Sequence, residues 1–129
     1  MSRLEKVLFM ATIVLLIPLA TLSAQNYPTR WSDWNQFDSY PNISYRIRCT
    51  HLNSANHMYN WEMEVQNNTD KNLNISATLS DANQDDSQNS YGSATIQSGG
   101  SHIFHIIFLN TAPGGGTIRA YMKSPKIAN

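Results

Sequence analysis

The sequence predicts an antiparallel β-sandwich of about six to seven short strands, preceded by a secretory signal peptide. Beyond residue 25, apolar side chains recur at every second position and not at the 3.6-residue period of a helix. Runs of Asn, Asp, Ser and Gly separate these alternating segments and are typical of turns. Cys49 is the only cysteine, so an internal disulfide is excluded and stability must come from an apolar core.

Residues 1–24 have the layout of a cleaved signal peptide. Arg3 and Lys6 precede an uncharged apolar run, and small residues end at Ala24. An uncleaved membrane anchor is the alternative, but the run is shorter than the roughly 20 apolar residues that a spanning helix needs. Pro18 also interrupts its end. We therefore expect a secreted or periplasmic protein that is not stably inserted in a membrane after cleavage.

The rest of the chain divides into three parts. Residues 25–42 form an aromatic N-terminal segment, residues 43–123 the β-sandwich domain, and residues 124–129 a flexible tail. The first two strands of the domain are expected at 43–51 and 59–67, with a loop between them at 52–58.

Charge pairing predicts the register of these two strands. If they form a hairpin, Arg48 lies opposite Glu62 and Arg46 opposite Glu64 on the outer face. The same register aligns the inner, apolar face, because side chains alternate with a period of two. The inner pairs are then Cys49 with Trp61, Ile47 with Met63, and Tyr45 with Val65.

Four more strands follow. The turn after Val65 can carry the chain into a second sheet, where residues 73–80 form the third strand. Residues 91–97 are weakly apolar and suit a sheet edge. Residues 102–110 are apolar on both faces, which is typical of a central strand. Residues 117–123 form the last strand.

The stretch from Tyr59 to Met122 resembles the small immunoglobulin-like modules of bacterial exported and adhesion-related proteins. The shared pattern is a strand ending in Asn-Asn, an apolar strand, a Ser-Gly-Gly-Ser turn and a long apolar strand. The resemblance implies an immunoglobulin-like sandwich that binds partners or spaces other domains. It supplies no site motif, so no functional residue is transferred to this chain.

The aromatic N-terminal segment contains the candidate contact residues Trp31, Trp34, Phe37 and Tyr40. Two readings are open for them. The rings could cover the open end of the core, or they could form an exposed surface for a glycan or a protein partner. Tryptophan is favoured at interfaces because it buries a large area and carries one polar group.

Metal and cofactor sites have little support. Asp81, Asn83 and Asp85 place oxygen ligands at alternate positions, as in a calcium loop. Asp86 stands where an EF-hand needs glycine, and no helices flank the loop, so these residues are only a weak calcium candidate. We expect no cofactor. Cys49 is expected to be a small buried hydrophobic residue, with a reactive thiol or an intermolecular bridge as the alternative.

Charge and motif content argue against two classes of function, nucleic-acid binding and catalysis. Nine Lys and Arg balance nine Asp and Glu, and no basic stripe supports nucleic-acid binding. No nucleophile motif is present, so we expect no enzyme, although a small hydrolase with an unrecognised site is a third reading. The prediction is a non-enzymatic exported binding or interaction module of unknown ligand. The alternative is a structural accessory protein that assembles through an exposed edge at residues 91–97.

Overall fold

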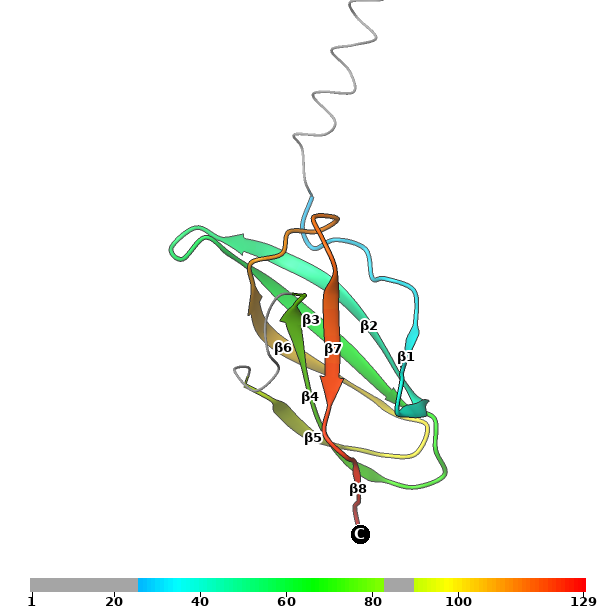
Figure 1. Cartoon of the computed structure of the whole chain (residues 1–129). Helices are drawn as coiled ribbons and strands as arrows, with labels where there is room; N and C mark the ends of the chain where they lie inside the picture. The colour runs from blue at the N-terminus through cyan, green and yellow to red at the C-terminus, as the bar shows by residue number, and fades with distance from the viewer. Residues whose placement is uncertain (1–25, 83–89) are drawn as a thin grey trace, which may run out of the picture.

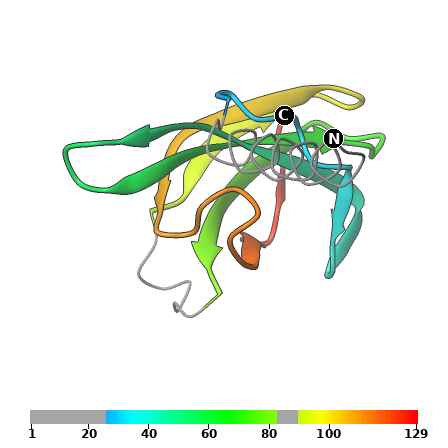
Figure 2. The ribbon, with the colours of Figure 1, turned by 90° about the horizontal axis from the view of Figure 1, so that it is seen from above.

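The computed structural model describes residues 26–82 and 90–129, and this part of the chain consists of β-strands joined by turns and loops, with no helix. The predicted signal peptide, as well as Asn83 and Asp85, lies outside the described residues. The described strands form two antiparallel sheets that pack face to face (Figures 1 and 2). An all-β, antiparallel fold was predicted, and the structure confirms it at this level.

The first sheet has the strand order β1-β2-β3-β6. Its strands are β1 (Asn35–Phe37), β2 (Tyr40–Asn53), β3 (Met58–Asn67) and β6 (Ser101–Leu109). The hairpin of β2 and β3 is long, and its tip projects beyond the rest of the domain (Figures 1 and 2).

The second sheet has the order β5-β4-β7, and β8 also pairs with β4. Its strands are β4 (Leu73–Asp81), β5 (Gly92–Ile96), β7 (Ile118–Met122) and β8 (Lys126–Ile127). The chain passes from the first sheet to the second after β3, as predicted. The last residues differ from the prediction of a flexible tail at 124–129, because β8 pairs with Leu73 and Asn74.

The predicted hairpin register is confirmed. Arg46 lies opposite Glu64 and Arg48 opposite Glu62, while Cys49 lies opposite Trp61 on the inner face. The expected loop at 52–58 is shorter in the structure, because β2 continues to Asn53 and β3 begins at Met58. Polar residues at the hairpin tip hid these extra strand positions, since both sides of the tip face solvent.

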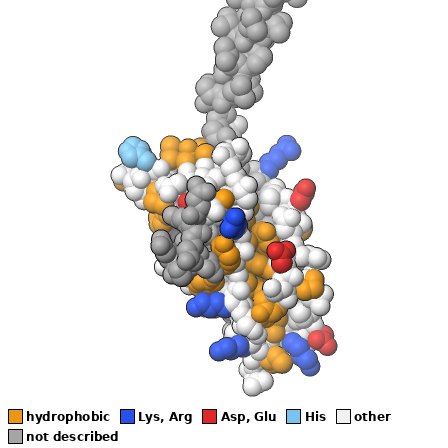
Figure 3. Space-filling model, viewed as in Figure 1, with side chains coloured by type: hydrophobic (Ala, Val, Ile, Leu, Met, Phe, Trp, Pro, Cys, Tyr) orange, Lys and Arg blue, Asp and Glu red, His pale blue; other side chains and the backbone are white. Residues whose placement is uncertain are grey.

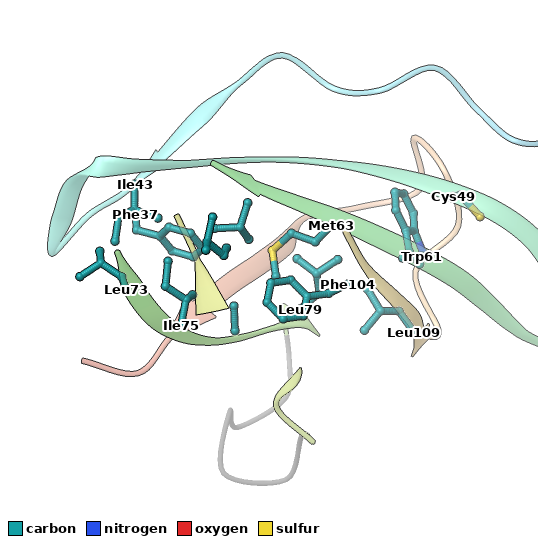
Figure 4. Close-up of a cluster of buried hydrophobic side chains, with 13 residues drawn as sticks. Phe37, Ile43, Cys49, Trp61, Met63, Leu73, Ile75, Leu79, Phe104 and Leu109 are labelled. Atoms are coloured by element: carbon teal, nitrogen blue, oxygen red, sulfur yellow. The ribbon is translucent and has the colours of Figure 1, made fainter. Parts of the chain in front are cut away.

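The core lies between the sheets and includes many of the side chains predicted to point inward (Figure 4). Met63 and Val65 from β3 and Ile75 and Leu79 from β4 are almost fully buried. The whole buried apolar set is Phe37, Ile43, Cys49, Trp61, Met63, Val65, Leu73, Ile75, Ala77, Leu79, Ile96, Phe104 and Leu109. Period-two burial therefore builds the core, with no disulfide.

The position predicted for the strand at 102–110 is wrong. Within the described residues β6 pairs only with β3 and lies at a sheet edge, where a central strand was expected. The reason is an irregularity in the ladder: Phe104 lies opposite Met63, whereas Ile107 lies opposite Trp61. One extra residue in β6 shifts the inward positions from even to odd numbers, as a β-bulge does. The sequence consequently looks apolar on both faces.

Asn67 holds the crossing between the sheets. Its side chain is fully buried, and its amide nitrogen donates to the carbonyl oxygens of Lys71 (2.7 Å) and Ile96 (2.9 Å). Its amide oxygen accepts from the backbone N–H (3.0 Å) and the hydroxyl (2.6 Å) of Thr69. These bonds tie the end of β3 to the segment before β4 and to the end of β5.

Candidate functional site

The aromatic N-terminal segment runs along the free side of β2. The backbone N–H of Thr29 donates to the carbonyl of Cys49 (2.9 Å), and that of Ser32 donates to the carbonyl of Ile47 (2.8 Å). The side-chain hydroxyls of Thr29 and Ser32 accept from the N–H groups of Cys49 and Ile47 in return, each at 3.0 Å. The segment is thereby held as an irregular continuation of the first sheet, next to β1.

This placement brings two tryptophans over the arginines of β2. The guanidinium carbon of Arg46 lies 4.9 Å from the ring centre of Trp31 and 4.6 Å from that of Trp34. The guanidinium carbon of Arg48 lies 4.4 Å from the ring centre of Trp31. All three distances are within the range of cation–π attraction, worth about 0.5–1 kcal/mol each at an exposed site.

The same arginines are paired with glutamates on β3. Arg46 binds Glu64 at 2.7 Å, and Arg48 binds Glu62 at 2.6 Å through its Nε. The outer face of the first sheet thus carries two parallel rows that cross the strands from the N-terminal segment to β3. Each row contains tryptophan, arginine and glutamate in that order.

Side chains of β6 complete both rows. The Ser101 hydroxyl donates to Glu64 (3.1 Å), and the His105 ring contacts Glu62 (2.6 Å from Nδ1 to Oε2). Glu62 is the most enclosed member, with 8% of its side chain exposed. We call the set of Trp31, Trp34, Arg46, Arg48, Glu62, Glu64, Ser101 and His105 the outer-face ladder.

The four predicted aromatic candidates separate into two groups. Phe37 is buried in the core, where its ring packs against Tyr45 at 4.7 Å, and Tyr40 packs partly against the same core. Trp31 is half-buried on the outer face, and Trp34 is 42% exposed there. The structure therefore does not bring the four rings into one surface.

Sequence reasoning missed the link between the tryptophans and the charged pairs. The register prediction placed both arginines and both glutamates on the outer face, but it did not place the N-terminal segment beside them. The Trp31–Trp34 spacing of three fits either a helical turn or an irregular segment, and the structure shows an irregular extended segment. The contact of His105 with Glu62 was not predicted, because the irregularity in β6 decides which face His105 lies on.

The calcium candidate has a structural role in its described part. The Asp81 carboxylate is buried and accepts from the backbone N–H groups of Asn110 (3.0 Å) and Thr111 (2.9 Å), and from the Thr111 hydroxyl. These hydrogen bonds stabilise the carboxylate in its buried position, and they hold the loop that follows β6. Within residues 26–82 and 90–129, no group of three His, Cys, Asp or Glu side chains could hold a metal ion.

Cys49 is fully buried, as expected of a small hydrophobic residue. Burial raises the pKa of its thiol, which disfavours the thiolate that reacts with electrophiles and metals. Its Sγ lies 3.8 Å from the carbonyl oxygen of His51. The thiol is therefore protected in the folded chain.

Comparison with known proteins adds no relative. No protein-family model, no curated protein and no solved structure matches the chain. A search of the described residues for a helix long and apolar enough to cross a membrane finds none.

Proposed function

We propose that this protein is an exported, non-enzymatic binding module whose outer-face ladder binds a neutral glycan. The observation that carries the proposal is Trp34, an exposed indole ring held in place by Arg46 on a broad sheet face. Exposed aromatic rings on a rigid support offer binding area at little cost in conformational entropy. Such a ring can stack on the apolar face of a sugar.

Charge balance favours a neutral ligand. Both arginines of the ladder are already paired with glutamates, so the face presents no net charge for an anion or a cation. The exposed parts of Arg46 and Arg48 nevertheless keep N–H donors, and the His105 ring keeps a second polar nitrogen, which can bond to hydroxyl groups. The guanidinium groups are held in place beside the aromatic rings, so they can bind a ligand that is rich in hydroxyl groups.

A neutral-glycan microarray probed with residues 25–129 tests this proposal. We expect binding to at least one class of neutral oligosaccharide and its loss in Trp34→Ala. Leu52→Ala is the matched control, because Leu52 is 45% exposed at the far end of the β2–β3 hairpin. An array without a neutral ligand, or equal binding by Trp34→Ala and the wild type, contradicts the proposal.

We also propose that the sandwich is immunoglobulin-like and that the chain is exported. Two antiparallel sheets connected by crossings after β3, β5 and β6 support the first part. The basic start, apolar run and small residues before Gln25 support the second. Mass spectrometry of the protein recovered outside the cytoplasm should give a chain that begins at Gln25. A chain that retains Met1 to Ala24 contradicts cleavage.

The second candidate function is assembly through a sheet edge. One observation favours it: β5 lies at the edge of the second sheet, as predicted for residues 91–97. In that case Ala94→Pro should prevent assembly while Trp34→Ala leaves it intact. Analytical ultracentrifugation of both variants distinguishes this function from glycan binding, and a wild-type chain that stays monomeric argues against self-assembly.

A further inference from the structure

The edge formed by β7 differs from the other edges of the sandwich. The second sheet has three strands side by side, whereas the first has four. Within the described residues β7 pairs only with β4, so every second backbone N–H and C=O of β7 points away from the sheet. β8 pairs with the next stretch of β4 on the same side and prolongs this edge.

The space beside β7 is apolar and incompletely filled. Ile118, Ala120 and Met122 of β7 are only partly buried, and so is Ile47 of β2, which lies near Ile118. A cavity of about 310 Å³ lies at the first residue of β7, between Ile118, Ile47 and the loop that precedes β7. Figure 3 shows this face, with apolar side chains running between the charged ones.

The edge strands on the opposite side of the sandwich, β5 and β6, lie close together. A Cβ atom added at Gly92 of β5 would lie 2.6 Å from Cδ1 of Phe104 in β6. The ladder irregularity in β6 also disturbs its outer edge, which is a common protection against pairing.

The charges of β7 indicate what kind of strand fits there. Arg119 and Lys123 are exposed on its outer face, and Lys126 follows in β8. The ammonium of Lys123 lies 4.7 Å from the Tyr91 ring centre. Among the described residues, no carboxylate lies within ion-pair distance of Arg119 or Lys126.

The pairing of β2 with β3 is a model for how a partner strand could pair with β7. β2 alternates apolar and basic residues, and its partner β3 alternates apolar residues with Glu62 and Glu64. β7 has the same inward alternation as β2, with Ile118, Ala120 and Met122 inward, and its outward residues are Arg119 and Tyr121. Opposite charges directly across two strands stabilise the pair, whereas like charges destabilise it.

We propose that the free edge of β7 accepts one extended segment of a partner protein in which apolar residues alternate with Asp or Glu. The partner's backbone pairs with β7, as in other cases of strand addition. Its apolar side chains cover the partly buried residues beside β7, and its carboxylates face Arg119. This surface is separate from the outer-face ladder, which lies on the other sheet.

The test uses a blocked, fluorescently labelled octapeptide of alternating valine and glutamate as the probe. Fluorescence anisotropy should detect binding to residues 25–129, and amide hydrogen exchange should slow in β7. The same peptide with N-methylated valines should not bind, because it cannot complete the backbone ladder. Trp34→Ala should bind the peptide like the wild type, which separates this proposal from the glycan proposal.

Two matched variants test the charge argument. Arg119→Gln should weaken binding about two- to fivefold, the effect of one exposed cross-strand ion pair. Gln97→Glu changes the net charge equally but lies beyond β5, so it should leave affinity unchanged. The proposal is overturned if the valine–glutamate peptide does not bind or slows exchange in β5 or β6 instead. It is also overturned if a valine–lysine peptide binds equally well, or if Arg119→Gln has no effect.

Discussion

At the scale of single residues, two buried polar groups connect elements that the apolar core alone does not join by hydrogen bonds. Asn67 and Asp81 are both buried, and each satisfies its hydrogen bonds with backbone groups from another element. An unsatisfied buried polar group costs about 1–3 kcal/mol, so such residues tolerate substitution poorly. Sequence reasoning placed Asn67 at the end of a strand and Asp81 in a weak calcium candidate, because Ile96 and Thr111, which they bind, are distant in the sequence.

Asn67→Ala should lower the free energy of unfolding by about 2–3 kcal/mol, since it leaves the carbonyls of Lys71 and Ile96 without their donor. Asn68→Ala is the control, because Asn68 is exposed and donates only to the Ser44 hydroxyl among side chains. Urea unfolding of both variants provides the measurement. Equal losses at the two neighbouring positions would show that Asn67 does not hold the crossing.

Ionisation of the Cys49 thiol makes the free energy of unfolding depend on pH in the alkaline range. The thiol has an ordinary pKa near 9.0, and burial raises the pKa in the folded chain. The unfolded chain therefore loses this proton first, and the free energy of unfolding falls as the pH rises above 9.0. Burial and Asp38 also raise the pKa of Tyr45, so part of the fall belongs to that residue.

Urea midpoints at pH 8 and pH 10 test this contribution. The wild type should lose more stability over this interval than Cys49→Ala, which has no thiol to ionise. The same pH dependence in both proteins would mean that the Cys49 thiol is not protected by folding.

At the scale of elements, the charged pairs select the register of β2 and β3. A double-mutant cycle with Arg46→Met and Glu64→Gln should give a coupling energy of about 0.5–1 kcal/mol, because this pair is partly exposed. The cycle with Arg48→Met and Glu62→Gln should give about 1–2 kcal/mol, because Glu62 is more enclosed. Thermal unfolding at low salt provides both values. A larger coupling for the more exposed pair would contradict the described burial.

The sequence predicts regular pairing well and irregular pairing poorly. The β2–β3 register followed from matching charges and matching apolar faces, since one slip would expose the whole inner face. The edge position of β6 did not follow, because a single inserted residue exchanges its inner and outer faces. The stacking of Trp31 on two arginines was equally hidden, because the N-terminal segment joins the sheet without regular alternation.

At the scale of the whole molecule, the two faces of the first sheet differ in composition. Its inner face supplies most of the core, and its outer face carries the outer-face ladder. The second sheet is narrower and leaves β7 with a free edge. One small domain thereby presents two separate surfaces, a neutral aromatic face and a basic strand edge.

The outer-face ladder rests on the placement of Trp34, and acrylamide quenching of tryptophan fluorescence tests that placement most directly. Trp61 is buried, Trp31 is half-buried, and Trp34 is 42% exposed. We expect wild-type emission to contain a red-shifted, readily quenched component that disappears in Trp34→Phe, while the blue-shifted emission remains. Quenching that is unchanged in Trp34→Phe would contradict an open ring at this position.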